Sequence, residues 1–331
     1  MKALLSKCVG GPEALVLDDI PVPSPGTGEV LLSVRACGVN FPDSLIIKDR
    51  YQFRPPRPFS PGGEVAGVVT GVGEGVTKCK PGDRIIGWVN WGGMAESIVL
   101  DETQCILMPS SMPFDEASAF IMTYGTSYHA LKERGRLRAQ ETLLVLGAGG
   151  GVGLAAVELG KALGARVIAA ASSTQKVAEA KKRGADETIV YPRSEPGRSG
   201  ESLVEIFKRA CGPNGADVIY DAVGGPYSEA SLRAIAWEGR FLVVGFPAGI
   251  ARIPLNLPLL KSCQIVGVFW AAWTKRDPKA FETSTNELFG LYEKGKIKPL
   301  ISERFPLDRG AEAIRWLADR KAIGKVIVTM E

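Results

Sequence analysis

A glycine-rich turn at residues 147–153 carries the clearest chemical signal in the sequence. It follows a strand-like apolar run at residues 142–146 and opens a helix-like stretch at residues 152–163, which is the context that a dinucleotide-binding fingerprint requires. A glycine inside such a turn lets the backbone approach a pyrophosphate, and a glycine at its end lets the helix pack closely on the sheet. The N–H groups that open the helix bind phosphate. In the frame that begins with Ala, the sequence predicts a dinucleotide-binding loop formed by Ala148, Gly149, Gly150, Gly151, Val152 and Gly153.

The second strand of this region indicates which dinucleotide binds. In NAD-binding chains, an Asp or Glu about 20 residues after the glycines binds the ribose 2′-OH. Here the strand at residues 166–170 is followed by Ser172, Ser173 and Lys176, and no acidic residue occurs before Glu179. Hydroxyls and an ammonium suit a 2′-phosphate, so these residues predict NADPH. In the alternative interpretation, one serine caps the next helix and the lysine is only solvated.

The cysteine and histidine content argues against a metal site. Six cysteines are scattered without a Cys-x-x-Cys pair, and His129 is the single histidine. The sequence therefore lacks a set of thiolates and imidazoles for zinc. Scattered cysteines without a disulfide framework are typical of reduced thiols in the cytosol, so we expect a cytoplasmic protein.

Length and charge exclude several classes of protein. The 331 residues include 40 Lys and Arg against 36 Asp and Glu, a net charge of +4, and 45% are apolar. These proportions exclude a disordered chain, and the length predicts about two domains at ~150 residues each. No basic stripe indicates nucleic acid as a partner. The longest uncharged segment, residues 142–157, is too short and glycine-rich to cross a membrane, and residues 1–7 lack the apolar stretch of a signal peptide.

The chain has two parts with different patterns of expected secondary structure, and these parts position the residues above. Residues 1–110 read as short strands separated by Gly and Pro turns, which favours a barrel or sandwich. From about residue 115, strands alternate with helices, which predicts βαβ units and a parallel sheet. The expected strands of this second part are residues 142–146, 166–170, 188–190, 217–220, 241–244 and 264–269, and the most loop-like segment is residues 193–200.

Motifs along the whole chain resemble a known superfamily. They are Ala-Cys-Gly-Val-Asn-Phe-Pro-Asp at residues 36–43, Pro-Gly-Gly-Glu-Val-Ala-Gly at 61–67, Pro-Gly-Asp-Arg at 81–84, Thr-Ser-Tyr-His-Ala-Leu at 126–131, the glycine turn, and Gly-Lys-Val-Ile-Val at 324–328. With them the chain resembles the medium-chain dehydrogenase/reductase superfamily, and more narrowly its zinc-free quinone oxidoreductase, or zeta-crystallin-like, branch. Two residues depart from the family pattern, because Gly149 stands where Ser is usual and Glu158 where Gln is usual.

The resemblance implies an α/β chain with two domains. A GroES-like β-barrel catalytic domain would comprise residues 1–115 with 285–331. A Rossmann domain, a doubly wound parallel sheet that binds NADPH, would comprise residues 116–284. The long apolar strand expected at residues 264–269 ends the sheet, and we expect a homodimer joined there, because an open sheet edge invites pairing with a twofold mate.

The zinc-dependent relatives provide a contrast. The resemblance places Asn40, Gly63 and Met122 where those relatives have Cys, His, and Cys or Asp around zinc. Asn, Gly and Met do not form a zinc ligand set, so the resemblance implies no metal. Without a Lewis acid, hydride transfer favours acceptors whose conjugation spreads the developing charge, namely quinones and α,β-unsaturated carbonyls.

The resemblance also implies which residues form the site. Those that would line the domain cleft are Asn40, Asp43, Tyr51, Tyr124 and Thr126, with Asn40 and Thr126 at the nicotinamide ribose or ring and Tyr51 as a phenol donor. In the alternative interpretations, Asp43 satisfies loop N–H groups and Tyr124 is a wall residue. The further implied cofactor contacts are Tyr191 at the adenosine phosphate, and Gly245, Phe246, Phe269 and Trp270 at the nicotinamide; these last aromatic residues suit the core or a dimer interface equally well.

Two other functions stay open at this point. An enoyl-thioester reductase that acts on acyl-CoA would need basic residues for the CoA phosphate, and Arg50, Arg54 and Arg57 are candidates. A nucleotide-binding, non-catalytic crystallin-like or RNA-binding protein is the alternative of another class. The intact glycine turn and the lack of a basic stripe favour an NADPH-dependent enzyme with a small quinone or enone substrate.

Overall fold

The computed structural model describes residues 1–191 and 202–330, so the loop-like segment expected at residues 193–200 lies outside the described residues. The chain divides into two compact units, Met1–Met122 with Pro299–Glu331, and Thr123–Lys298. We expected the boundaries near residues 115 and 284. The second boundary lies later because helix α10 (Pro278–Glu293) packs on helix α9 (Trp270–Arg276), where the rings of Phe281 and Trp270 are 5.8 Å apart.

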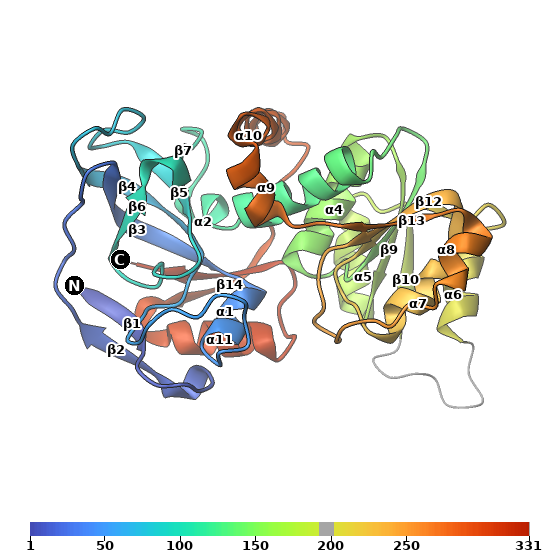
Figure 1. The fold of residues 1–331 in the computed structure, drawn as a ribbon, viewed down its shortest axis with the longest axis horizontal. Coiled ribbons are helices and arrows are strands. Elements are labelled where there is room, and N and C mark those ends of the chain that lie inside the picture. Colours follow the sequence, from blue (N-terminus) through green and yellow to red (C-terminus); the bar gives the residue numbers. More distant parts are fainter. Residues whose placement is uncertain (192–201, 331) are drawn as a thin grey trace. The chain divides into compact units, whose positions relative to one another are not determined.

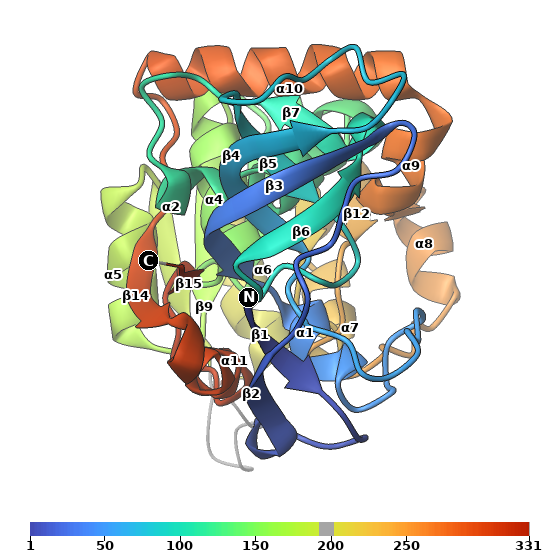
Figure 2. The same cartoon turned by 90° about the vertical axis from the view of Figure 1, so that its left-hand side faces the viewer.

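The first unit contains a seven-stranded sheet and a separate antiparallel pair of strands. Its strands are β1 (Lys2–Ser6), β2 (Leu15–Asp19), β3 (Glu29–Val39), β4 (Glu64–Val72), β5 (Arg84–Trp88), β6 (Ser97–Asp101), β7 (Cys105–Leu107), β14 (Ile301–Pro306) and β15 (Lys325–Thr329). The sheet order is β14-β15-β3-β4-β5-β7, and β6 pairs with β3 (Figure 2). Its helices are η1 (Pro12–Ala14), α1 (Phe41–Ile46), η2 (Glu102–Gln104), α2 (Phe114–Ala117), η5 (Leu307–Arg309) and α11 (Gly310–Ala318).

Strand β3 shows why this sheet forms. Its residues Val30, Leu32 and Val34 are buried, whereas the residues between them are partly exposed. This period of two is what a strand with one covered face requires. The buried side chains join the core of the unit, and β15 brings Val326 and Val328 to the same core from the far end of the chain.

The second unit is a six-stranded parallel sheet covered by helices. Its strands are β8 (Thr142–Leu146), β9 (Arg166–Ala171), β10 (Glu187–Val190), β11 (Ala216–Asp221), β12 (Ile235–Val243) and β13 (Gln264–Gly267). The other helices are η3 (Ile121–Gly125), which begins in the first unit, α3 (Thr126–Tyr128), η4 (His129–Arg134), α4 (Gly151–Ala162), α5 (Thr174–Lys182), α6 (Leu203–Cys211), α7 (Pro226–Leu232) and α8 (Asn256–Lys261). Helices α4 and α5 pack on β8, β9 and β10, and α7 and α8 pack on β12 (Figure 1).

The order of this sheet locates its ligand-binding edge. The order is β10-β9-β8-β11-β12-β13, and all neighbouring strands are parallel. This confirms the doubly wound parallel sheet, in which ligands bind at the carboxyl ends of the strands where the order reverses, here between β8 and β11. The central strands are almost wholly buried, as a sheet covered on both faces requires.

The last strand is shorter than the sequence suggested. We expected a strand at residues 264–269, but β13 ends at Gly267, and Phe269 precedes helix α9. Strand β13 is nevertheless the edge of the sheet, and most of its side chains are exposed. Among the described residues, no helix combines the length and the apolar character needed to cross a lipid bilayer.

Candidate functional site

The glycine turn lies at the carboxyl end of β8, where the sheet order reverses. Gly147 follows the strand with a φ of 74°, a conformation that glycine adopts without strain. Gly150 precedes helix α4 in an extended conformation, and its N–H donates to the Gly147 oxygen at 3.0 Å. The N–H of Ala148 donates to the oxygen of Ala170 at 3.0 Å, which ties the turn to the end of β9. The turn therefore presents the start of α4 at the ligand-binding edge.

Two glycines of this turn have different steric roles. A Cβ on Gly153 would lie 2.1 Å from the Gly147 oxygen and 2.8 Å from the Ala148 Cα, so only glycine fits between helix and turn. A Cβ on Gly150 would meet nothing closer than the Gly147 oxygen at 3.7 Å, which is an ordinary contact. Gly153 thus serves the packing of the helix, whereas the space beside Gly150 is open to a ligand.

The turn after β9 lies against the glycine turn. A Cβ on Gly149 would fall 2.6 Å from the Lys176 Cβ, so the lysine stem passes directly over this glycine. Ser173 caps helix α5, because its Oγ accepts a hydrogen bond from the Lys176 N–H at 3.4 Å. Ser172 is half-buried beside it, and Glu179 pairs with Arg183 and is not at the end of β9. The cap expected in the alternative interpretation exists, and Lys176 is packed rather than merely solvated.

Helix α3 is anchored to the glycine turn. The Ser127 hydroxyl donates to the Val152 oxygen at 2.9 Å and lies 2.9 Å from the hydroxyl of Tyr220 on β11. The half-buried Thr126 directly precedes Ser127, whose hydroxyl is bound to the start of α4. Within this unit, Thr126 therefore lies close to the start of α4, at the ligand-binding edge of the sheet.

Tyr124 turns into the interior of the second unit. It is 2% exposed, and its hydroxyl donates to Glu158 at 2.5 Å. Arg183 holds the other oxygen of the same carboxylate at 2.5 Å. Burial raises the pKa of Tyr124 and also that of Glu158. This hydroxyl is committed to an internal carboxylate. Glu158, which departs from the family pattern, is therefore the partner of Tyr124.

The remaining cofactor candidates of this unit differ in exposure. Tyr191 is buried and packs on Tyr227, with ring centroids 4.8 Å apart. Gly245 follows β12, and its N–H donates to the Asp221 oxygen at 3.2 Å. The exposed aromatic candidates are Phe246 (49%) and Phe269 (54%), whereas Trp270 is buried in α9. The structure thus places Gly245 at the carboxyl end of β11, while the two phenylalanines project from the surface of the unit.

In the first unit, Asn40, Glu64 and Lys325 form a buried polar cluster. The Lys325 ammonium donates to Asn40 Oδ1 at 2.6 Å and to Glu64 Oε2 at 3.2 Å. The Asn40 amide nitrogen donates to the same Glu64 oxygen at 3.1 Å. Glu64 is 0% and Lys325 4% exposed, so both charges are removed from water and depend on each other. Glu64 and Lys325 lie in motifs of the sequence but were not predicted as site residues, although a Glu and a Lys within apolar strands are a recognisable signal of a buried pair.

Asp43 and Tyr51 lie beside this cluster. Asp43 is buried, and its carboxylate accepts the N–H of Asn40 at 2.7 Å and that of Gly62 at 3.0 Å. Burial raises the pKa of Asp43 to about 6. The half-buried Tyr51 has its pKa raised by burial and by the charge of Asp43, and among the described residues its hydroxyl has no hydrogen-bond partner. Asp43 therefore shapes the loop, and Tyr51 retains a phenol that can bind a ligand.

The three positions aligned with zinc ligands do converge within the first unit. The Asn40 amide nitrogen lies 3.4 Å from the sulfur of Met122, and a Cβ on Gly63 would lie 3.8 Å from that sulfur. An amide, a thioether and a glycine do not form a zinc site. Among the described residues, no group of three His, Cys, Asp or Glu side chains could hold a metal ion. The donor chemistry at this position therefore does not fit zinc.

The three arginines proposed for a CoA phosphate differ in their exposure and in their hydrogen bonds. Arg57 is half-buried, binds Asp49 through both terminal nitrogens at 2.8 and 3.3 Å, and donates to the Ile47 oxygen. Arg50 and Arg54 are exposed. Arg57 is thus used to hold its own loop, which removes one of the three candidate phosphate ligands.

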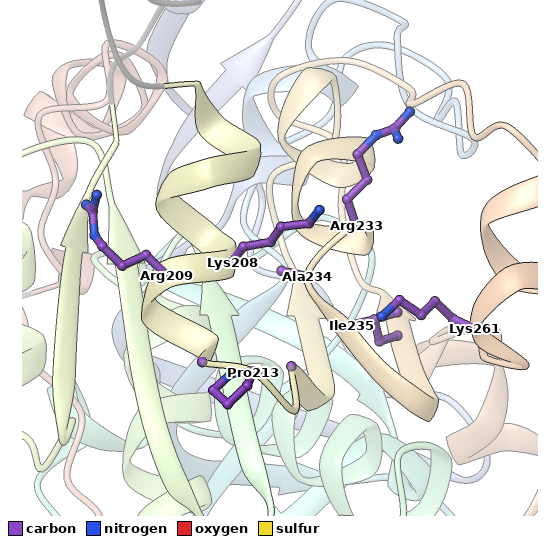
Figure 3. Close-up of a pocket in the computed structure, with 9 residues that line it drawn as sticks. Lys208, Arg209, Pro213, Arg233, Ala234, Ile235 and Lys261 are labelled. Atoms are coloured by element: carbon purple, nitrogen blue, oxygen red, sulfur yellow. The ribbon is translucent and has the colours of Figure 1, made fainter.

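A basic hollow in the second unit lies away from the glycine turn. It has a volume of about 480 Å³, and its basic lining residues are Lys208, Arg209, Arg233 and Lys261. The Arg209 side chain extends away from the other three (Figure 3). The lining of the hollow includes Ile235, the first residue of β12, so the hollow lies at the amino ends of the strands. The glycine turn follows the carboxyl end of β8, and the hollow is therefore separate from it.

Comparisons with known proteins agree with this architecture. Residues 26–110 match the alcohol dehydrogenase GroES-like domain, and residues 151–287 match the family described as zinc-binding dehydrogenase. The chain is 38% identical to the quinone oxidoreductase-like protein 2 homolog of Nematostella vectensis, and the match covers 99% of this chain and 88% of that protein. The chain belongs to the quinone oxidoreductase branch of the medium-chain dehydrogenase/reductase superfamily. This confirms the GroES-like fold of the first unit and the Rossmann fold of the second.

Further members of this branch are similar over the whole chain. Quinone oxidoreductase-like protein 2 of Rattus norvegicus is 35% identical over 98% of this chain and 91% of its own. A Pseudomonas syringae quinone oxidoreductase structure has a TM-score of 0.89 and 30% identity, with 99% of each chain covered. Escherichia coli quinone oxidoreductase, solved in complex with NADPH, has a TM-score of 0.90 and 28% identity over 99% of this chain and 100% of its own.

Proposed function

We propose that the protein is an NADPH-dependent oxidoreductase that reduces quinones or α,β-unsaturated carbonyls without zinc. The observation that carries the proposal is the glycine turn. In this turn Gly153 packs against Gly147, and Gly150 leaves space at the ligand-binding edge of the sheet. The NADPH complex of the Escherichia coli relative supports the choice of cofactor. The donor set at Asn40, Gly63 and Met122 supports chemistry without zinc.

NADPH fits the residues that the structure brings to this edge. The N–H groups that open helix α4 would bind its pyrophosphate, and Gly150 would allow the close approach. The half-buried Ser172 and the packed Lys176 would recognise the 2′-phosphate, with Tyr191 on the adenosine side. The absence of an acidic residue between the end of β9 and Glu179 removes the charge that would repel this phosphate.

When bound, NADPH supplies a hydride to the β-carbon of an enone or to a quinone. The negative charge then lies on a conjugated oxygen, so the protein needs to supply only modest hydrogen bonds and one proton. Tyr51 is the proposed proton donor, directly or through water, because its hydroxyl is not committed to another described residue. Asn40 is proposed to orient the nicotinamide ribose, and Thr126 to contact the ring region. Each serves positioning rather than bond making.

A substrate panel tests this function. Purified protein is mixed with NADPH or NADH and with a quinone, a short enone, the matching enoyl-CoA thioester, and a saturated ketone, and nicotinamide absorbance is followed. We expect turnover with the quinone or the free enone, faster with NADPH, and little with the ketone. Preference for the CoA thioester over its free enone would favour the enoyl-thioester reductase instead. Brisk oxidation of a saturated alcohol with NADP⁺ would contradict chemistry without a Lewis acid.

The assembly proposed is a homodimer joined at the edge strand β13. This strand leaves unpaired backbone groups, and its Ile265 is 42% exposed. Helix α8 beside it exposes Leu259 (77%) and Leu260 (64%), an apolar surface that a second copy of the chain would cover. Sedimentation at micromolar concentration would show a dimer, and a charged substitution such as Ile265→Asp would shift it to monomer. A wild-type monomer at this concentration would contradict the assembly.

A cytoplasmic location is proposed from the thiols. None of the six cysteines, all of them within the described residues, forms a disulfide, and Cys37, Cys79 and Cys211 are buried. Reduced cysteines are typical of the cytosol.

A further inference from the structure

Gly149 has a neighbour that sequence spacing does not suggest. A Cβ built on Gly149 would lie 2.6, 2.7 and 2.8 Å from Cβ, Cγ and Cδ of Lys176. Carbon atoms do not approach so closely without a shift, so the aliphatic stem of Lys176 occupies the space that any side chain at position 149 would need. Gly149 is also a residue where the family pattern usually has Ser.

The contact joins two elements with separate roles in dinucleotide recognition. Gly149 belongs to the turn proposed to bind the pyrophosphate, and Lys176 lies in the first turn of α5, where the 2′-phosphate is proposed to bind. The Lys176 Cβ is fixed by the backbone of α5, so a change of rotamer cannot relieve the overlap. Ser173 caps this turn of α5, and the Ala148 N–H is bonded to the end of β9, so neither element is free to move away.

We propose that Gly149 is a specificity-determining residue, because its missing side chain lets the Lys176 stem cross the glycine turn and sets the position from which Lys176 recognises a phosphate monoester on the adenosine ribose. The proposal rests on the proposed function, namely that this turn binds NADPH. It adds that preference for NADPH over NADH depends on the pair Gly149–Lys176 and not on Lys176 alone. A side chain at position 149 should weaken the binding of NADPH more than that of NADH, although this side chain does not itself contact the 2′-phosphate.

Dissociation constants for NADPH and NADH, measured by titration calorimetry, test the pair. Gly149→Ala places the Cβ against the lysine stem, and Lys176→Met removes the ammonium but keeps an unbranched stem. We expect Lys176→Met to lower the NADPH preference about tenfold or more, the loss of one charge-assisted bond. Gly149→Ala should lower the NADPH preference at least about fivefold. The double variant Gly149→Ala/Lys176→Met should have the same preference as Lys176→Met, because the two changes remove the same interaction.

Gly150→Ala is the matched control within the same turn. Its Cβ would meet only an ordinary contact at 3.7 Å, so it should weaken both cofactors alike through the pyrophosphate and leave their ratio unchanged. The proposal would be overturned if Gly149→Ala also left the ratio of the NADPH and NADH dissociation constants unchanged. It would likewise be overturned if the losses of NADPH preference multiplied in Gly149→Ala/Lys176→Met. Wild-type protein without a preference for NADPH would overturn the proposed cofactor together with the pair, and that result is visible before any variant is made.

A stability measurement covers the case in which Gly149→Ala folds poorly. The double variant Gly149→Ala/Lys176→Gly lacks every Lys176 side-chain atom that the new Cβ would meet. We expect it to melt at a higher temperature than Gly149→Ala, although glycine in a helix is itself unfavourable. No recovery would show that the overlap does not arise from Lys176 and would overturn the proposal.

Discussion

The Lys325 ammonium lies 2.6 Å from the side-chain oxygen of Asn40, although the two residues are 285 positions apart in the chain. An ammonium can only donate, so it must face the amide oxygen, and the amide nitrogen then faces Glu64. One buried cation therefore sets the orientation of a proposed site residue. Because the amide nitrogen is already held by Glu64 and by the Gly38 oxygen, we expect Asn40 to accept, not donate, any further bond to the cofactor.

Removal of Lys325 should destabilise the protein strongly. Lys325→Met leaves the fully buried Glu64 carboxylate without its cation, and breaking a buried pair in this way costs about 3–5 kcal/mol. Urea unfolding followed by circular dichroism measures the change. The double variant Lys325→Met/Glu64→Gln removes both charges and should recover a large part of the loss. A double variant less stable than the single one would contradict the mutual dependence of the two charges.

Asp43 should give the folded protein a defined pH response. Its pKa is raised by burial to about 6 from 3.8, so the folded state binds this proton more tightly than the unfolded state does. The ionised carboxyl therefore costs stability above about pH 6, and this cost disappears as pH falls toward 3.8. The difference between a pKa of 3.8 and one of about 6 corresponds to a change in unfolding free energy of up to about 3 kcal/mol.

Comparison with Asp43→Asn isolates this response, because the other carboxyls cancel in the difference. The unfolding free energy of wild type minus that of Asp43→Asn should rise when pH is lowered from about 7 to about 4. Burial is the largest influence on the pKa of Asp43 and raises it, although the N–H groups of Asn40 and Gly62 and the charge of Lys325 lower it. A difference that falls, or that does not vary with pH, would show the assignment to be wrong.

Two alanine substitutions in the glycine turn should separate folding from binding. Gly153→Ala forces a Cβ to within 2.1 Å of the Gly147 oxygen, so both thermal stability and NADPH affinity should fall sharply. Gly150→Ala meets no clash and should cost only about 1 kcal/mol in stability as a weaker helix cap. It should still weaken NADPH about tenfold or more, because the backbone can no longer approach the pyrophosphate. Similar stability losses in both variants would contradict these roles.

The proton donor should be replaceable. A site that depends on one oxyanion donor loses about 10²–10³ in rate when the donor is removed, but a conjugated acceptor needs less help. We therefore expect Tyr51→Phe to retain at least about a tenth of the quinone reductase rate. Asn40→Ala should be more damaging, because it misplaces the nicotinamide ribose. Steady-state kcat and KM with NADPH and one quinone measure both variants, and complete loss in Tyr51→Phe would contradict the mechanism.

Chelation should not reduce activity. No described group of side chains offers three zinc ligands, so dialysis against a chelator should leave quinone reduction unchanged. Metal analysis of the active protein provides the second measurement. Tightly bound zinc in stoichiometric amount would overturn the alignment of Asn40, Gly63 and Met122 with the ligand positions of zinc-dependent relatives.

The local features of the fold could be predicted from the sequence. Strand β8 has the bounds that its pattern suggested, and the glycine turn lies between β8 and α4 as expected. The shortened β13 and the early start of β12 at Ile235 were not foreseen. At these edge positions, pairing with a neighbour decides where a strand ends, and an apolar run alone does not show it.

The sequence by itself determined the order of the strands and helices and the place of the glycine turn, because these depend on residue types within short segments. Only the tertiary structure decided that Lys325 orients Asn40, that Glu158 takes the Tyr124 hydroxyl, and that the Lys176 stem covers Gly149. These contacts join residues on different elements, and their geometry depends on strand register and helix packing. A buried charge or hydroxyl must find a partner wherever the fold brings one, and spacing along the chain does not name that partner.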